Sequence, residues 1–207
     1  MSQQQTKNSI TLKGSAQIIC EYLRFAINSV LFQRGLYPPE SFKAEQEYGL
    51  TLLISEDPLI KGFISDILKK SEEWILKKEV KKLSLVIINV SNKEVLECWD
   101  FNVQYEEGDV VLSKEKNEKV SSKDLKKIQL EIRDVMLQVA ATISYLPLLD
   151  CRCSFDIYVH ANPECNIPEK WMEAAPISIS NAQNVQLKSF STNLHKMDTV
   201  VTYKLMD

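Results

Sequence analysis

The stretch LSLVIINV, residues 83–90, is apolar and rich in β-branched side chains, which predicts a strand at the centre of a sheet. Residues 91–93, Ser-Asn-Lys, form a turn signal, and residues 94–105 are predicted to return as a second strand. One face of this second strand carries four large side chains: Trp99, Phe101, Val103 and Tyr105. The chain is therefore expected to build its core on a central antiparallel pair of strands.

Three helices are predicted around this pair. The first runs from a cap at Ser15 to about Arg34 and is apolar nearly all round, which is typical of a helix in the middle of a domain. The second begins at Asp57-Pro58, where an N-cap residue precedes a proline at the first helical position. The third is capped by Asp124 and extends to about Tyr145. Its core-facing stripe is expected to hold Leu125, Ile128, Ile132, Val135, Val139 and Ile143.

The remaining segments predict further strands. They are a short strand at Ile10–Lys13, a hairpin within 41–55 around Gly49, a strand at 151–160, and two C-terminal strands, Val185–Asn193 and Thr199–Leu205, joined by residues 195–198. Residues 106–122 are charged and are expected to form a loop without a domain break. The fold class is therefore α+β: one domain, with three main helices against a mixed, mainly antiparallel sheet.

Composition excludes several classes of protein. The chain has 207 residues, 44% hydrophobic and 26% charged, and its net charge of −3 argues against a dedicated nucleic-acid-binding protein. No apolar run is long enough to span a membrane, and the amino terminus has no apolar signal-peptide core. We expect a protein of the cytosol or nucleus, whose five cysteines stay reduced.

Little in the sequence supports catalysis or a cofactor. Five glycines, none within twelve residues of another, leave no phosphate-binding loop. Cys151, Cys153, His160 and Cys165 fall within fifteen residues, but C-x-C lacks the usual spacer of a zinc site, so free thiols are the better interpretation. A nucleophilic pair of Cys151 with His195 is conceivable, although nothing in the sequence positions the two side chains. No catalytic, cofactor or metal residue is assigned.

Two features suggest binding. The third helix carries a second stripe, Leu130, Leu137, Ala141 and Tyr145, which belongs either to a wide core face or to a protein contact surface. Trp171 lies in the proline-containing segment 161–183, where it either belongs to the core or packs into a groove under a mobile flap.

Several strings of residues resemble the HORMA-domain family. They are Leu12–Ala16, Ile27–Pro38, Tyr48–Leu53, Tyr145–Leu149, Cys153–Asp156, Pro168–Trp171 and Leu194–Lys196. The resemblance covers residue 10 to about 205, so it implies one domain at 10–207 after a disordered tail, 1–9. It also implies a peptide clasp whose C-terminal segment, about 160–207, acts as a safety belt. In the closed state this belt passes over a peptide and pairs with the far edge of the sheet; in the open state it pairs where the peptide would lie.

The resemblance also implies site residues. The strand Cys151–Val159 is expected to accept a peptide as an added strand. The predicted peptide-binding residues are Cys151, Cys153, Phe155, Ile157, Trp99 and Trp171. The predicted switch residues are Leu12, His195 and Tyr203, with Leu12 expected at the sheet edge that the belt takes on closing. The predicted interface for a dimer or adaptor is Leu137, Gln138 and Tyr145, and Leu137 stands where the family usually has arginine.

The implied function is that of a non-enzymatic adaptor of the spindle assembly checkpoint that delays anaphase. Its implied peptide partners are a kinetochore coiled-coil protein and the activator of the anaphase-promoting complex. Further implied partners are a second copy in the other conformation, a HORMA-like adaptor and an AAA+ remodelling ATPase. The implied location is the nucleus and cytoplasm, with unattached kinetochores in mitosis. The alternatives are a HORMA adaptor for translesion polymerase assembly or meiotic chromosome axes, a small cysteine enzyme using Cys151 or Cys165, and a structural dimer subunit without ligand.

Overall fold

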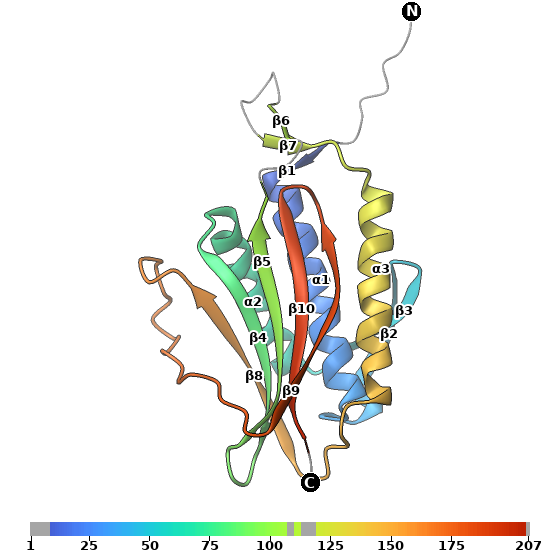
Figure 1. The fold of residues 1–207 in the computed structure, drawn as a ribbon, viewed down its shortest axis with the longest axis vertical. Coiled ribbons are helices and arrows are strands. Elements are labelled where there is room, and N and C mark those ends of the chain that lie inside the picture. The colour runs from blue at the N-terminus through green and yellow to red at the C-terminus, as the bar shows by residue number, and fades with distance from the viewer. Residues whose placement is uncertain (1–8, 107–109, 113–118, 206–207) are drawn as a thin grey trace, which may run out of the picture.

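The computed structural model describes residues 9–106, 110–112 and 119–205. A five-stranded sheet, in the order β8-β4-β5-β10-β9, has all its helices on one face (Figure 1). The helices are α1 (Leu12–Gln33), α2 (Pro58–Leu76) and α3 (Leu125–Ala141), with 3-10 turns at Pro39–Ser41 and Thr142–Ser144. The strands are β1 (Ile10–Thr11), β2 (Phe42–Glu47), β3 (Leu50–Ser55), β4 (Val80–Asn89), β5 (Val95–Tyr105), β6 (Val110–Leu112), β7 (Lys119–Ser121), β8 (Cys153–Ala161), β9 (Ala182–Ser191) and β10 (His195–Lys204).

The predicted α+β class is confirmed, but the described strands pair only in antiparallel fashion, so the sheet is not mixed. The central pair β4–β5 has the predicted antiparallel arrangement, with Leu83 opposite Phe101 and Leu85 opposite Trp99. These four side chains are fully buried, in the core between the sheet and the helices. Among the described residues, no helix is long and apolar enough to cross a membrane.

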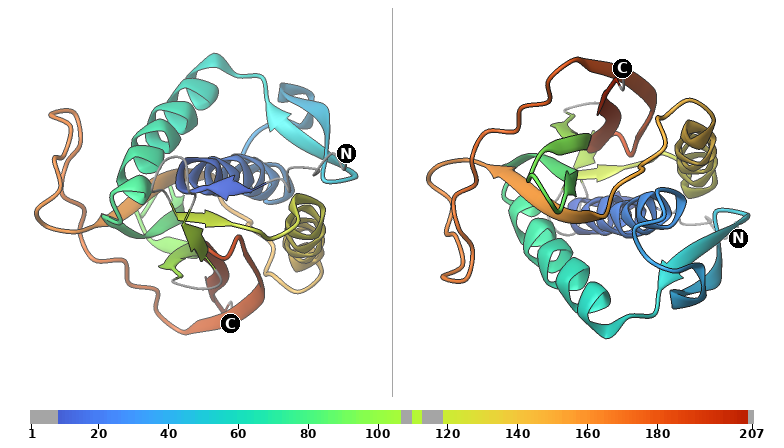
Figure 2. Two further views of the ribbon diagram at one scale, coloured as in Figure 1. Left: turned by 90° about the horizontal axis from the view of Figure 1, so that it is seen from above. Right: turned by 90° about the horizontal axis from the view of Figure 1, so that it is seen from below.

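Helix α1 lies between the sheet, α2 and α3, as its apolar surface predicts (Figure 2). It begins earlier than expected, because Thr11 is the N-cap and accepts a hydrogen bond from the backbone N–H of Gly14 at 3.1 Å. The prediction that Ser15 caps the helix is therefore wrong: Ser15 lies inside it and is fully buried. Of the predicted strand at Ile10–Lys13, only Ile10 and Thr11 form a strand, β1, while Leu12 and Lys13 begin α1. Strand β1 pairs with β7 and not with the main sheet.

The other two helices begin where the sequence predicts. Asp57 accepts hydrogen bonds from the N–H groups of Leu59 and Ile60, and Asp124 accepts one from Lys126. Helix α3 ends at Ala141 and continues as a 3-10 turn, which rotates Ile143 away from the core. The prediction that Leu125 and Ile143 face the core is wrong, since both side chains are exposed.

The loops show one confirmed turn and two corrections. The hairpin β2–β3 turns at Tyr48 and Gly49, both with positive φ. The sequence predicts a connection at 195–198, but these residues belong to β10, and the chain turns at 192–194. Thr192 Oγ1 accepts from the N–H of His195 at 3.0 Å and closes this turn. The described part of 106–122 forms the short strands β6 and β7, and residues 107–109 and 113–118 lie outside the described residues, as does most of the predicted tail at 1–9.

A buried ion pair joins the end of α1 to the sheet. Arg34 Nε donates to Glu97 Oε1 at 2.8 Å, Trp99 Nε1 donates to Glu97 Oε2 at 3.2 Å, and Arg34 also donates to the carbonyl oxygen of Pro147. The side chains of Arg34 and Glu97 are 5% and 2% exposed. Removing one partner would leave the other charge buried without compensation.

We predict that Glu97→Ala lowers the free energy of unfolding by about 3 kcal/mol, the cost of breaking one half of a buried pair. The matched control is Glu45→Ala, because the side chains of the Arg24–Glu45 pair are 41% and 37% exposed. The control should cost about 1 kcal/mol or less. Urea denaturation followed by tryptophan fluorescence measures both values, and equal losses would contradict the prediction.

Candidate functional site

One edge of the main sheet is open. Strand β8 pairs with β4 from Cys153 opposite Asn89 to Ala161 opposite Val80. Among the described residues no strand pairs with its other side, so β8 forms the left edge of the sheet in Figure 1. An unpaired edge presents a row of backbone donors and acceptors that an extended peptide can satisfy. This edge is the candidate site.

Apolar side chains lie next to this edge. The ring of Phe155 on β8 contacts Tyr37 and Phe63 edge to face, with centroids 6.1 and 5.8 Å apart. Ile157, two residues farther along β8, is buried. On α2, Phe63 is 40% exposed, and Leu59 one turn earlier is 83% exposed. The apolar rim is defined as Leu59, Phe63 and Phe155. It joins β8 through the Phe63–Phe155 contact, and Leu59 extends it by one turn of α2.

The segment 162–181 leaves the end of β8 and crosses to the start of β9 at the opposite edge of the sheet (Figures 1 and 2). At its start, the N–H of Asn162 donates to the carbonyl oxygen of Glu79 at 2.7 Å. In the middle, the rings of Trp171 and Trp74 meet edge to face with centroids 5.3 Å apart. At its end, the N–H of Leu205 donates to the carbonyl oxygen of Asn181 at 2.9 Å. This segment, called the strap below, is thus fixed at both ends and at one central residue.

The hairpin β9–β10 occupies the far edge of the sheet. Strand β10 pairs with β5 from His195 opposite Tyr105 to Tyr203 opposite Glu97. Behind this pairing, Phe190 packs against Tyr22 of α1 at 4.9 Å between centroids, and the Tyr22 hydroxyl lies 2.7 Å from Thr199 Oγ1. The hairpin is therefore built into the core.

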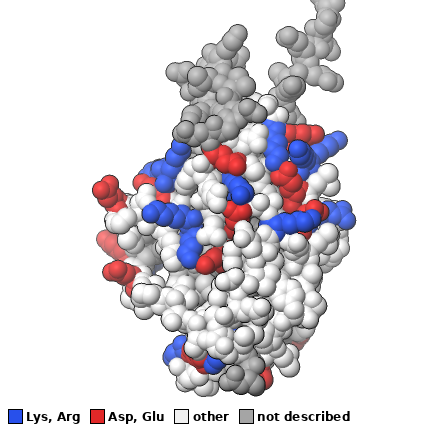
Figure 3. Space-filling view, viewed as in Figure 1, with Lys and Arg blue, Asp and Glu red and all other residues white. Residues whose placement is uncertain are grey.

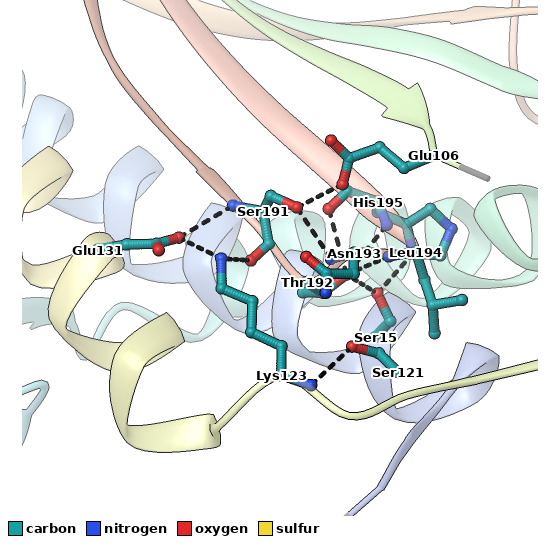
Figure 4. Close-up of polar contacts among 10 residues, drawn as sticks. All are labelled: Ser15, Glu106, Ser121, Lys123, Glu131, Ser191, Thr192, Asn193, Leu194 and His195. Carbon is teal, nitrogen blue, oxygen red and sulfur yellow. Dashed lines mark hydrogen bonds and ion pairs between the residues drawn. The ribbon is translucent and has the colours of Figure 1, made fainter. Parts of the chain in front are cut away.

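Two polar clusters hold the tip of this hairpin (Figure 4). In the first, Ser15 Oγ lies 2.6 Å from His195 Nδ1 and 2.5 Å from Thr192 Oγ1, all fully buried. In the second, Lys123 Nζ donates to Glu131 Oε2 at 2.7 Å and to the carbonyl oxygen of Ser191 at 2.6 Å. The tip is thus tied to α1 and to the start of α3.

The face of the sheet away from the helices carries charges of both signs in its upper half and few in its lower half (Figure 3). The charges pair across strands, for example Lys82 with Asp100 at 2.9 Å. On the face that Figure 3 shows, no broad patch of one sign is present, unlike the basic surface expected of a nucleic-acid-binding protein.

Comparisons with known proteins agree with this geometry. The family model of the HORMA domain matches residues 15–195. The chain belongs to the HORMA-domain family. It is 42% identical over 205 residues to the mitotic spindle assembly checkpoint protein MAD2A of Mus musculus, covering 99% of this chain and 98% of that one. It is 36% identical over 206 residues to the mitotic spindle checkpoint component mad2 of Schizosaccharomyces pombe, covering 99% of each.

Solved structures give the same fold. A chain in a crystal structure of the mitotic checkpoint complex superposes with a TM-score of 0.82 and 38% identity, covering 93% of this chain and 99% of that one. A structure of C. elegans HTP-2 bound to a HIM-3 closure motif superposes with a TM-score of 0.78 at 14% identity, over 96% and 93% of the two chains, which shows the fold alone. The HORMA fold and the similarity to spindle checkpoint proteins that the sequence indicates are both confirmed.

In HORMA terms, the described hairpin has the place implied for the closed state, since it pairs with β5 and leaves β8 free. Of the predicted switch residues, His195 and Tyr203 lie on β10, and the Tyr203 hydroxyl donates to Gln183 Oε1 at 3.0 Å. Leu12 is the first residue of α1 and not part of an edge strand. Strand β10 occupies the edge of β5, and β1 pairs with β7 outside the main sheet.

The predicted peptide-binding residues divide into two groups. Cys153, Phe155 and Ile157 lie on β8, Cys151 lies just before it, and Trp171 lies on the strap. Trp99 is not with them: it lies on β5, separated from β8 by β4, with its side chain fully buried under α1. A peptide at the outer edge of β8 cannot touch it, so its assignment is corrected to a core role.

Sequence reasoning assigned Phe155 to the site but not the other two residues of the apolar rim, Leu59 and Phe63. Leu59 and Phe63 follow the helical spacing of core residues, yet both side chains are exposed, and Phe63 contacts Phe155 at the unpaired strand. The four candidate zinc ligands also separate: Cys165 is buried, and His160 Nε2 lies 3.0 Å from Ser84 Oγ. Among the described residues, no group of three metal-ligating side chains is present.

Helix α3 places its second stripe outward. Leu130, Leu137 and Tyr145 are exposed, and so is Ala141, so the interpretation as a wide core face is wrong. Gln138 is half-buried, and its side-chain oxygen accepts the backbone N–H of Lys188 on β9. The stripe thus borders the C-terminal hairpin.

The environment of His195 predicts that acid weakens the hairpin. Its Nε2 is buried without a partner among the described residues, and burial, aided by Lys78, lowers the pKa of His195 from its usual 6.5 to about 4. Tyr105 packs against the ring, and Nδ1 meets Ser15. Because a detached hairpin would return the pKa to about 6.5, the paired hairpin keeps its full stability above that pH and loses it as the pH falls toward 4.

We predict that hydrogen exchange of the β10 amides, corrected for intrinsic rates, shows about tenfold more opening at pH about 5.5 than at pH about 7.5. His195→Gln does not titrate in this range and should remove most of that difference. His160→Gln is the matched control, since His160 lies on β8, far from the hairpin tip. Equal pH dependence in all three proteins would contradict the role of His195.

Proposed function

We propose that this HORMA protein is a spindle assembly checkpoint adaptor that captures a short peptide along the outer edge of β8 and retains it beneath the strap 162–181. The observation that carries the proposal is the position of the C-terminal hairpin on β5, which leaves the edge of β8 unpaired below a strap that crosses the sheet. The checkpoint role is supported by relatives in animals, plants, fungi and Dictyostelium that match over nearly their full length and carry checkpoint names.

In the proposed mechanism, the peptide adds to β8 as a sixth strand. Its backbone pairs with β8, which supplies affinity, while the apolar rim selects apolar side chains at alternate positions. The strap then prevents sideways departure. No covalent step is needed, so the protein acts as an adaptor and not as an enzyme. Residues 10–207 form one domain in this proposal, with about 160–207 as the safety belt.

Two peptide partners fit the proposal: a kinetochore coiled-coil protein and the activator of the anaphase-promoting complex, whose capture delays anaphase. The similarity to a chain of the mitotic checkpoint complex supports assembly with partners, and the HTP-2 structure, which is bound to a closure motif, supports peptide capture by this fold. The proposed location is the nucleus and cytoplasm, with unattached kinetochores in mitosis. A role in translesion polymerase assembly is less supported, because the DNA polymerase zeta subunit 2 of Drosophila melanogaster is 23% identical over 153 residues.

The exposed stripe of α3 is proposed as a second contact surface. Leu137 and Tyr145 are 46% and 43% exposed, and Gln138 joins this surface to the hairpin. The proposed partners there are a second copy in the open conformation and a HORMA-like adaptor. An AAA+ ATPase is the proposed remodelling partner. With leucine at 137, the contact is apolar and does not use an arginine fork.

Peptide capture tests the main proposal directly. A fluorescent peptide with a basic residue, two apolar residues and a later proline is mixed with the full chain, and anisotropy is followed with time. We expect slow association and slower dissociation, because entry requires the strap to move. A chain lacking residues 198–207 loses most of β10 and should release the peptide rapidly. A well-folded full chain that does not bind would overturn the checkpoint assignment.

Leu59→Ala is predicted to weaken this peptide's affinity by roughly threefold to tenfold, since it removes the exposed apolar area by which α2 extends the apolar rim. The matched control is Leu130→Ala, which truncates a leucine on α3 that is 61% exposed. Because neither leucine is buried, stability should stay unchanged. An effect of Leu130→Ala without one of Leu59→Ala would move the peptide site to α3.

Trp171→Ala is predicted to speed peptide dissociation by about tenfold, because the strap loses its aromatic contact with Trp74. The neighbouring Met172 is 90% exposed, so Met172→Ala is the matched control and should leave the rate unchanged. Stopped-flow chase with unlabelled peptide measures both rates. An unchanged rate for Trp171→Ala would show that the strap does not limit release.

A further inference from the structure

Two thiols lie side by side where the candidate peptide edge begins. The Sγ atoms of Cys151 and Cys153 are 3.6 Å apart, and Cys153 Sγ also donates to the carbonyl oxygen of Cys151 at 3.4 Å. Both residues are half-buried, whereas Cys20, Cys98 and Cys165 are buried. The Cys151–Cys153 pair therefore combines a short thiol–thiol distance with access for a small reagent.

We propose that Cys151 and Cys153 form a reversible disulfide with a low-molecular-weight disulfide such as oxidised glutathione as the oxidant, and that this bond weakens peptide capture at β8. Formation of the disulfide is inferred from the thiol geometry alone. Its effect on peptide capture rests on the proposed function. A disulfide needs the two sulfur atoms at about 2.05 Å, so each Sγ must move by less than about 1 Å. Side-chain rotation supplies part of this movement, and the backbone of Arg152 supplies the rest.

The exchange proceeds in two balanced steps. The Cys151 sulfur, as thiolate, attacks one sulfur of oxidised glutathione, which forms a mixed disulfide and releases one glutathione thiol. Cys153 then loses its proton, and its sulfur attacks the Cys151 sulfur, which releases the second glutathione. The protein gives up two electrons and two protons, and one oxidised glutathione becomes two reduced molecules. Burial and the adjacent Cys151 raise the pKa of Cys153, which slows the step in which this thiol loses its proton.

The bond would act on peptide capture through the backbone. Arg152, between the two cysteines, accepts the N–H of Val90 through its carbonyl oxygen at 2.9 Å, just beyond the last registered pair of β4 and β8. A disulfide between Cys151 and Cys153 closes a small ring that includes the backbone of Arg152. Closing this ring pulls the Arg152 carbonyl group toward the sulfur atoms. Cys153 also lies near Arg34 and Glu97. Ring closure thus shifts the first residues of β8, on which the added strand has to pair.

The test uses the full chain, first reduced and then equilibrated with oxidised and reduced glutathione in fixed ratios. Free thiols are alkylated after denaturation and mapped by mass spectrometry. We expect the segment with Cys151 and Cys153 to lose two hydrogen atoms and resist alkylation, while Cys20, Cys98 and Cys165 stay alkylated. Cys151→Ser and Cys153→Ser should each abolish the disulfide. A segment that stays fully alkylated, or that keeps glutathione as a stable mixed disulfide, overturns the proposal.

Anisotropy with the fluorescent peptide tests the consequence. Oxidised wild type should bind roughly threefold to tenfold more weakly than reduced wild type, the effect of about one hydrogen bond. Cys153→Ser treated with the same buffer is the matched control and should bind like its untreated form. If the disulfide forms and affinity does not change, the regulatory half is wrong. If the reduced protein does not bind, the proposed function fails, while mass spectrometry still decides whether the disulfide forms.

Discussion

The pairing of β10 with β5 is the constraint on which the rest of the structure depends. This pairing buries Met197, Val201 and Tyr203 of β10 in the hydrophobic core. It also brings β9 against α1, where Phe190 contacts Tyr22. With that edge filled, β1 pairs with β7 outside the main sheet. The chain must then cross from β8 to β9 as a strap, and β8 is left with an unpaired side. One choice of strand partner thus creates both the candidate site and the segment that closes it.

The strap has the length that such a role needs. From the end of β8 to the start of β9, the chain crosses four strand spacings, about 19 Å, and returns along about nine residues of strand, about 30 Å. The direct path is therefore about 36 Å by these spacings. The segment 162–181 reaches about 66 Å when fully extended. The excess leaves room for an added strand between the strap and β8, while the Trp171–Trp74 contact holds the strap close to α2.

Local signals predicted most of the fold, and long-range contacts decided the rest. The caps at Asp57 and Asp124 and the central strands depend on neighbours in sequence, and the structure confirms them. The sequence assigns Ser15 wrongly because its partners at the hairpin tip are 177 and 180 residues away. Leu59 and Phe63 have the spacing of core residues but are exposed, and Phe63 contacts Phe155 at the edge that the sheet leaves open. That choice is made by the whole sheet, so periodicity along one helix does not contain it.

Retention and affinity have separate physical sources in this arrangement. A peptide on β8 would gain backbone hydrogen bonds, each of net value about 1 kcal/mol, and a few apolar contacts at the rim. Its escape, however, requires the strap or the hairpin to open, and the hairpin is held by the β5 ladder, by the Tyr22–Phe190 contact and by two polar clusters at its tip. The barrier to release therefore arises from contacts that the peptide never touches. Such a clasp can hold a modest ligand for long times, and any process that opens the hairpin releases it without competing for the peptide itself.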